Sequence, residues 1–184
     1  MDITKQTLSV ILMLLTTSFI LASAAISGSF SKDIPENEIK AALIFKFPVY
    51  VRWPDSVMND KTGNFECCVL GNDPVSSLLT QFNGKKMMEQ TIRIRQLSNI
   101  REIDDCHMLF ISSPEKKNLL MIFKAIKGKP ILTVGHMKKF TQNGGIINFI
   151  RQEDSVRFEI NPKAAEQAGL KISSKLLRLA EIVK

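Results

Sequence analysis

The stretch that most constrains the fold is the last third of the chain, from Gly144 to Ala180. A glycine pair, Gly144-Gly145, precedes an apolar run at 146–150, and a polar cluster at 151–154 leads into the alternating run at 156–160. Two such runs separated by a short polar segment predict a β-hairpin with one half-buried strand.

Two helices are expected after this hairpin. Asn161 followed by Pro162 marks a helix start, with a side-chain cap and a proline at the first helical position. Gly169 ends this short helix, and a second helix begins at Ser173. The second helix should pack a stripe of apolar side chains at helical spacing into the core: Ile172, Leu176, Leu179 and Val183.

Upstream of residue 144, segments with helical and strand patterns alternate. Pro48 would cost about 3 kcal/mol inside a helix, so the first helix should stop or kink near Phe47. The pattern predicts a single α/β domain in which helices flank a mixed, mostly parallel central sheet, with the hairpin and two helices at its C-terminal end. The expected helices are 35–47, 74–82, 115–126 and 137–142, and the expected strands are 64–70, 91–95, 106–111 and 131–134.

The first residues have the pattern of an export signal. The run from Leu8 to Ala25 is apolar apart from Ser and Thr, and 22–24 is a small-x-small cleavage site. We expect residues 1–24 to be a signal peptide cleaved between Ala24 and Ala25, 25–34 to be a short flexible N-terminus and 35–184 to be the folded domain. The alternative is an uncleaved anchor, since the run approaches the length of a spanning helix. Cleavage would leave a periplasmic chain that does not span the membrane.

The net charge of +7 is unevenly distributed. Residues 25–84 hold 5 basic and 7 acidic side chains, whereas residues 85–184 hold 19 basic and 10 acidic ones. A basic half can bind nucleic acid, an anionic membrane or an acidic partner protein. An exported protein meets little nucleic acid, so no nucleic-acid partner is expected, and a solvated basic face that aids solubility is the favoured interpretation.

Three cysteines remain after the leader: Cys67, Cys68 and Cys106. In an oxidising compartment they indicate a disulfide first. Adjacent residues of a strand point to opposite faces, so Cys67 and Cys68 cannot both face Cys106. Buried free thiols are the alternative. The absence of a Cys-x-x-Cys motif argues against a thiol oxidoreductase.

The residues themselves give no catalytic, metal or cofactor site. His107 follows Cys106 on a predicted strand, where the two side chains diverge, so they cannot act as a nucleophile–base pair. His136 follows a strand, at the end where α/β proteins bind ligands, but a lone histidine is more simply a loop residue. Two histidines make no zinc site. The single Gly71 indicates a tight turn and helix cap instead of a dinucleotide fingerprint. We therefore expect no enzyme, metal or cofactor.

Several short motifs occur in a fixed order along the chain. They are the helical stretch 38–42, Trp53-Pro54, the strand end 68–71, the apolar strands 106–111 and 130–134, and the strings GGIINF (144–149), RFEIN (157–161), GLKISS (169–174) and LLRLA (176–180). Together they resemble the YfiR family of small periplasmic proteins, over about residues 36–183. One departure is Phe47-Pro48-Val49, where the family more often has a continuing helix. The shared residues look mainly structural: Trp53, Pro54, Gly71, Gly145, Arg157 and Asn161.

The resemblance implies a pairing and a function. The family places its first cysteine directly before the Val-Leu-Gly turn, which is Cys68 here, and this implies a Cys68–Cys106 disulfide. Cys67 would then be either buried and inert, or exposed and able to link two subunits. The family implies a homodimeric periplasmic repressor that binds the periplasmic domain of an inner-membrane diguanylate cyclase, limits cyclic di-GMP and biofilm, and is sequestered by an outer-membrane lipoprotein. The alternative is a periplasmic small-molecule-binding module serving another receptor, such as a sensor kinase.

Overall fold

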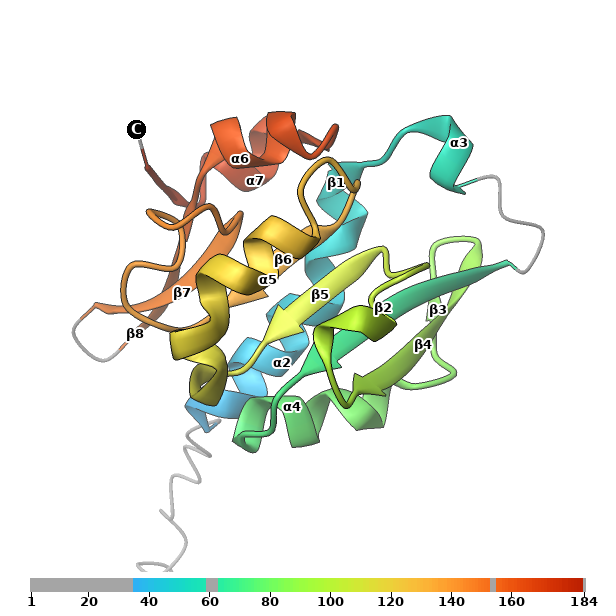
Figure 1. The fold of residues 1–184 in the computed structure, drawn as a ribbon, viewed down its shortest axis with the longest axis horizontal. Coiled ribbons are helices and arrows are strands. Elements are labelled where there is room, and N and C mark those ends of the chain that lie inside the picture. The colour runs from blue at the N-terminus through green and yellow to red at the C-terminus, as the bar shows by residue number, and fades with distance from the viewer. Residues whose placement is uncertain (1–34, 59–62, 153–154, 184) are drawn as a thin grey trace, which may run out of the picture. The chain divides into compact units, whose positions relative to one another are not determined.

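The structure, a computed structural model, describes residues 35–58, 63–152 and 155–183. The expected signal peptide, its cleavage site at Ala24–Ala25 and the N-terminus at 25–34 lie outside the described residues. None of the helices within those ranges has the length and apolar character needed to cross a bilayer. The described chain is organised around one eight-stranded sheet (Figure 1). From edge to edge its strands are β10 (Glu181–Ile182), β8 (Ser155–Ile160), β7 (Ile147–Gln152), β6 (Leu132–Gly135), β5 (Met108–Ile111), β2 (Asn64–Leu70), β4 (Gln90–Leu97) and β3 (Lys86–Met87).

The centre of the sheet is parallel, as the sequence pattern predicts. Strands β4, β2, β5, β6 and β7 run in one direction, with β2 between β4 and β5. The edges are antiparallel: β8 returns from β7 as the expected hairpin, and β3 pairs with β4. Every residue of β5 and β6 is buried, which explains why β5 is a continuous apolar run and why β6 has no charged residue.

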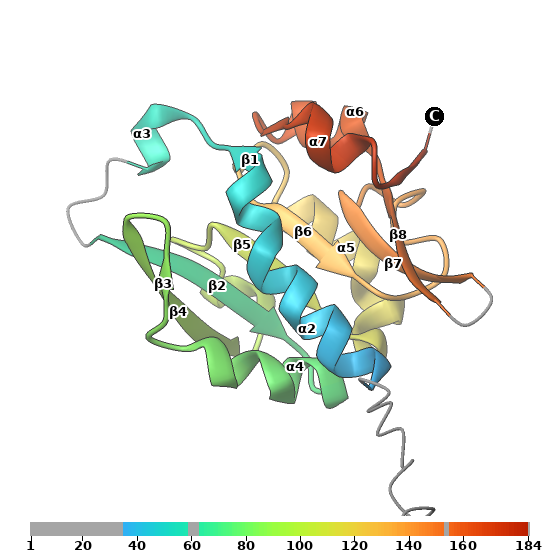
Figure 2. The same cartoon turned by 180° about the vertical axis from the view of Figure 1, so that it is seen from behind.

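Helices cover both faces of the sheet, and each face has its own apolar cluster. Helices α2 (Glu36–Lys46) and α4 (Pro74–Leu79) lie together on one face (Figure 2), above a cluster that includes Phe65 and Phe110. Helix α5 (Leu119–Ala125) lies on the opposite face (Figure 1), above a cluster that includes Leu109 and Phe140. The remaining elements are β1 (Val51–Arg52) and β9 (Lys171–Ile172), which pair with each other, and helices α3 (Asp55–Met58), α6 (Pro162–Gln167) and α7 (Ser174–Leu177).

The first helix stops where its proline predicts. Helix α2 ends at Lys46, and residues Phe47–Tyr50 form a single 3-10 turn with Pro48 buried. This turn redirects the chain into β1, whose residue Val51 pairs with Ile172. The departure from the family pattern at Phe47-Pro48 therefore coincides with a real change of direction.

The helix expected at 137–142 is absent, and a series of turns takes its place. Phe140 explains the difference, because its buried ring lies directly over the backbones of Gly135 and Gly145. A Cβ atom on either glycine would overlap this ring. Lys139 adopts a φ of 66°, which a regular helix does not allow.

The prediction of a long C-terminal helix from Ser173 is also wrong. Helix α7 covers only Ser174–Leu177, and the chain then extends as β10, which pairs in parallel with β8. Leu176 is buried as expected, but Leu179 is 66% exposed. The edge of β8 offers backbone hydrogen-bonding groups that a further helical turn would leave without a strand partner, so the chain pairs there instead.

Candidate functional site

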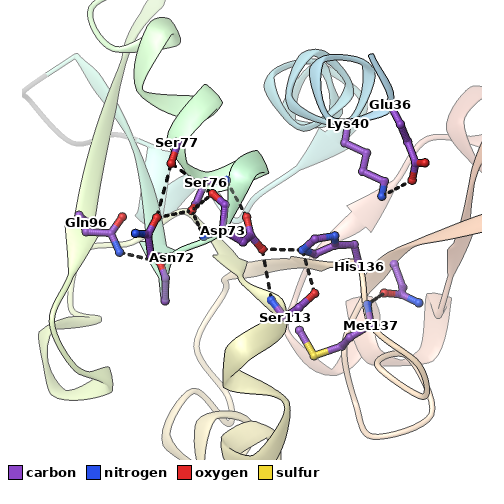
Figure 3. Close-up of polar contacts among 12 residues, drawn as sticks. Glu36, Lys40, Asn72, Asp73, Ser76, Ser77, Gln96, Ser113, His136 and Met137 are labelled. Carbon is purple, nitrogen blue, oxygen red and sulfur yellow. Dashed lines mark hydrogen bonds and ion pairs between the residues drawn. The ribbon is translucent and has the colours of Figure 1, made fainter. Parts of the chain in front are cut away.

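Three polar side chains meet at the carboxyl edge of the parallel sheet. Asp73 follows β2, Ser113 follows β5 and His136 follows β6, and these strands are neighbours. The Nε2 atom of His136 lies 2.6 Å from Oδ2 of Asp73 and 3.0 Å from Oγ of Ser113 (Figure 3). We call these three residues the edge cluster. The edge cluster joins the loops that leave three consecutive strands of the sheet.

Asp73 is the centre of the edge cluster because both of its carboxylate oxygens accept hydrogen bonds. Oδ1 accepts from the backbone N–H of Ser76 (2.9 Å) and caps α4, while Oδ2 also accepts from the backbone N–H of Ser113 (3.3 Å). Burial alone would raise the pKa of Asp73, but the bonds from His136 and from these amides outweigh it and lower the pKa to about 2. Asp73 therefore carries its negative charge at any ordinary pH.

The edge cluster does not have the geometry of a hydrolytic triad. In such a triad the acid and the nucleophile bind different ring nitrogens of the histidine, so that one nitrogen takes the nucleophile's proton while the acid orients the ring through the other. Here Asp73 and Ser113 share the same Nε2 atom of His136. Within the described ranges no group of three acidic, histidine or cysteine side chains is arranged to hold a metal ion. The arrangement can anchor loops, but it does not activate Ser113 as a nucleophile.

The turn after β2 lies at the point where the sheet order reverses, since β4 and β5 lie on opposite sides of β2. In open α/β sheets this is where ligands bind. Gly71 has a φ of +80°, and a Cβ atom there would approach Ser112 within 3.1 Å. Its carbonyl oxygen accepts a hydrogen bond from Nε2 of Gln96 (2.8 Å). Glycine at this position permits both the turn and the close packing of two loops.

A disulfide between Cys68 and Cys106, the pairing that the family resemblance implies, lies beneath α5 on the other side of the sheet. Its Cα atoms are 5.8 Å apart. Arg95, the neighbour of Cys68 on β4, places Nη2 3.6 Å from the Sγ atom of Cys68 and 3.4 Å from that of Cys106. The same guanidinium donates to the carbonyl oxygens of Glu102 (3.0 Å) and Asp104 (2.7 Å). The disulfide is therefore in direct contact with a positive charge.

The two other candidate residues of the sequence are buried and structural. Cys67 faces the α2 side of the sheet, and burial, reinforced by the neighbouring Glu66, raises the pKa of its thiol to about 12. This thiol is inert in the folded chain. His107 accepts a hydrogen bond at Nδ1 from the backbone N–H of Glu66 (2.9 Å) and stacks on Phe65.

The residues shared with the family occupy turns, caps and packing positions. Trp53 is buried and donates from Nε1 to the carbonyl oxygen of His107 (3.3 Å). Asn161 caps α6 through its Oδ1 atom, which accepts from the backbone N–H of Ala164 (2.9 Å). Arg157 is exposed on β8. Pro54 contacts the position of Gly169, and Gly145 lies beneath Phe140.

Sequence reasoning placed His136 at a strand end and Asp73 at a helix cap, but it did not bring them together, and it did not single out Ser113. The signal that could have found the edge cluster is that each residue follows a parallel strand within three positions. Only the strand order shows that these three strands are neighbours.

Comparison with known proteins supports both the fold and its class. A family model described as YfiR/HmsC-like matches residues 37–181. No curated protein matches the chain. The solved structures with similar folds include a conserved domain protein from Vibrio cholerae, with a TM-score of 0.57 at 13% identity over 83% of this chain. They also include an ABC domain from Streptococcus pneumoniae in complex with L-Trp, with a TM-score of 0.52 at 9% identity over 80% of this chain. The chain spans 61% and 60% of these two structures, and the likeness concerns the fold alone.

Proposed function

The chain belongs to the YfiR/HmsC-like family, and on that premise we propose that it is a periplasmic repressor of an inner-membrane diguanylate cyclase. It binds the periplasmic sensor domain of the cyclase, holds the cytoplasmic catalytic domain inactive, and so limits cyclic di-GMP and biofilm. The observation that carries this proposal is the family match, which spans nearly the whole described domain.

Two features of the structure support the proposal. The Cys68–Cys106 disulfide fits a chain that is exported to an oxidising compartment, as the apolar leader predicts. The edge cluster joins loops without the geometry of an activated nucleophile, which fits a family that is generally regulatory. The proposed assembly is a homodimer, and an outer-membrane lipoprotein that sequesters the repressor belongs to the same proposal.

The test is the intracellular concentration of cyclic di-GMP in the native host, with and without this gene. Deletion should raise cyclic di-GMP, and the full chain should restore the low level. A chain without residues 1–24 should fail to do so, because it stays in the cytoplasm. An unchanged level after deletion would contradict the proposal.

A redox step can be tested in the same strain. Reduction of Cys68–Cys106 removes a cross-link that stabilises the fold, so a Cys68→Ser chain should repress less and unfold more easily. Cys67→Ser is the matched control, since this thiol has no part in the cross-link. Full repression and full stability of Cys68→Ser would remove the redox step and leave the repressor proposal standing.

A second candidate, a small-molecule-binding module for another membrane receptor, is favoured by one cavity. It measures about 530 Å³, within the range of ligand sites, and lies between the end of α5 and α6. Its lining is mostly apolar and includes Phe123, Ile131, Ile146 and Ala164. A ligand that binds only the folded chain raises its melting temperature by mass action. L-Trp, the ligand of the similar Streptococcus structure, is the first probe, and a strong shift without any cyclase present would favour this candidate.

A further inference from the structure

The outward face of α5 and of the 3-10 turn before it combines positive charge with exposed apolar surface. Residues 113–129 hold five lysines and one acidic residue. Leu119 and Ile122 turn inward and are buried, whereas Leu120 and Met121 are 74% and 56% exposed. Leu120 is thus the most exposed of the large apolar side chains that the structure describes. Helix α5 lies in front of the sheet in Figure 1, and no other helix or strand covers it on the viewer's side.

Exposed lysines precede and follow these two apolar side chains along the chain. Lys116, Lys117, Lys124 and Lys127 are all exposed. Lys117, Leu120 or Met121, Lys124 and Lys127 follow one another at spacings of three or four. Leu120, Met121 and Lys124 lie on α5 itself, and Lys117 in the 3-10 turn before it and Lys127 in the turn after it extend this stripe at its two ends. We call this stripe, together with Lys116, the α5 face.

The positive charge of the α5 face is not neutralised within the described part of the chain, where no ion pair engages the ammonium groups of these four lysines. Lys129, the fifth lysine of the segment, does pair with Asp104 (2.7 Å). The acidic residue of the segment, Glu115, accepts a hydrogen bond from Nδ2 of Asn118 (2.8 Å). The α5 face is therefore electrostatically complementary to an anionic surface.

We propose that the α5 face binds an anionic lipid membrane, with Leu120 and Met121 inserted among the headgroups and the lysines on the lipid phosphates. Basic side chains bordering an apolar strip are the pattern of helices that lie in the membrane interface. Lysine stems can lie along apolar surface while their ammonium groups reach outward. The net charge of the whole chain, +7, acts in the same direction.

The composition of the α5 face decides between a lipid surface and an acidic protein. Energetically important contacts between proteins are enriched in Trp, Tyr and Arg, whereas lysine is depleted there. The α5 face consists of lysine, leucine and methionine, without an aromatic residue or an arginine. Electrostatic attachment to anionic lipid needs only clustered charge and asks for no geometric match, which suits flexible lysines.

This inference goes beyond the proposed function and does not depend on it. Membrane attachment would hold the chain in the plane where the periplasmic domain of a membrane protein lies, which raises its effective concentration at that partner. A chain that represses no cyclase could still bind lipid through α5, so the two proposals fail separately.

The experiment measures vesicle binding of the chain purified from the periplasm after expression with its own leader. Sedimentation with vesicles of equal parts phosphatidylglycerol and phosphatidylcholine should carry the protein down at physiological salt. Vesicles of phosphatidylcholine alone should not, and high salt should release the protein because it screens the lysines. Binding to neutral vesicles as strong as to anionic ones, or no binding to either, would overturn the proposal.

Two variants locate the binding on α5. Lys117→Gln with Lys124→Gln should lower the partition coefficient about 25-fold, at about fivefold for each lysine. Leu120→Ser with Met121→Ser should lower it about tenfold or more, because the inserted apolar surface is lost. All four side chains are exposed, so an unchanged melting temperature should show that the fold is retained.

Matched controls lie on α6, on α7 and in the turn after α7. Lys163→Gln with Lys175→Gln removes the same charge from exposed positions, and Leu179→Ser removes a similarly exposed leucine. These controls should change vesicle binding less than about threefold, and equal losses in the controls would overturn the assignment to α5. If the α5 variants abolished binding to an acidic protein, or dimerisation of the chain, while vesicle binding was absent, the surface would belong to that occupant instead of lipid.

Discussion

At the scale of single residues, Arg95 is the side chain that couples the disulfide to its surroundings. Its guanidinium contacts both sulfur atoms and is held there by the carbonyl oxygens of Glu102 and Asp104. A fixed positive charge beside two sulfurs favours the thiolate over the thiol and over the uncharged disulfide. Arg95 should therefore make Cys68–Cys106 easier to reduce.

Replacing Arg95 should make this disulfide more resistant to reduction. We expect Arg95→Gln to lower the reduction potential by tens of millivolts, where about 30 mV corresponds to about 1.4 kcal/mol. Equilibration in thiol redox buffers measures this potential. Arg93→Gln is the control, because Arg93 lies two positions earlier on β4 and pairs with Glu66 instead (3.8 Å). Equal potentials for Arg95→Gln and wild type would show that the guanidinium has no redox effect.

The low pKa of Asp73 leads us to expect that the free energy of unfolding falls at acid pH. Its pKa is about 2 in the folded chain against an ordinary value of 3.8, so between these values the unfolded chain binds more protons. The contribution of Asp73 is complete above about pH 4 and is lost as the pH falls towards 2, and it amounts to about 1–2 kcal/mol.

This loss of stability at acid pH can be measured by urea unfolding between pH 5 and 2. The wild-type free energy of unfolding should fall in that window, and Asp73→Asn should fall less steeply while being less stable at pH 5. Asp105→Asn, an exposed aspartate outside the edge cluster, should keep the wild-type slope. The same slope in Asp73→Asn as in wild type would remove Asp73 as its source.

At the scale of elements, the segment between β6 and β7 is shaped by one aromatic ring and two glycines. A methyl group at Gly145 would overlap the ring of Phe140, which is fully buried. Gly145→Ala should therefore destabilise the fold by about 1–3 kcal/mol. Phe140→Leu makes room at that position, so adding it to Gly145→Ala should cost less than the sum of the two single changes. Strict additivity in thermal or urea unfolding would argue that the ring does not exclude a side chain there.

The C-terminal elements give a second test, since a continuous helix and the observed α7–β10 path bury different leucines. Leu176 is 3% exposed and Leu179 is 66% exposed. Leu176→Ala should cost about 2–5 kcal/mol, whereas Leu179→Ala should stay within about 0.5 kcal/mol of wild type. Urea unfolding compares the two variants. A large loss of unfolding free energy for Leu179→Ala would support a continuous helix that buries Leu179.

At the scale of the whole molecule, the disulfide links strand β2 to the loop before β5 across a long stretch of chain. The cross-link closes a loop that begins at Cys68 and ends at Cys106, 38 residues later. This loop contains α4, β3 and β4. The chain-entropy model gives about 4 kcal/mol for such a loop, a large part of the 5–15 kcal/mol by which domains are typically stable.

The corresponding prediction compares oxidised and cross-link-free chains. Cys68→Ala with Cys106→Ala should lower the free energy of unfolding by about 4 kcal/mol. A reductant should destabilise the wild type by a similar amount and leave the double variant unchanged, which separates the cross-link from the loss of buried sulfur. A wild type that is indifferent to reductant would contradict the stabilising role.

The sequence by itself determined the elements whose signals are local. Strands β5 and β6 lack charged residues because they are buried on both faces, α4 and α6 begin at the side chains that cap them, and α2 ends two residues before its proline. The alternation of side chains along a strand already separated Cys67 from Cys68. The family motifs added the pairing of Cys68 with Cys106.

Only the tertiary structure decided what depends on contacts between distant segments. The turns at 137–142 have a helical pattern, and they fold otherwise because Phe140 packs on Gly135 and Gly145. The last residues leave the helix because β8 offers a free edge for pairing. The edge cluster exists because the strand order places the ends of β2, β5 and β6 side by side, and a local pattern carries no information on which strands are neighbours.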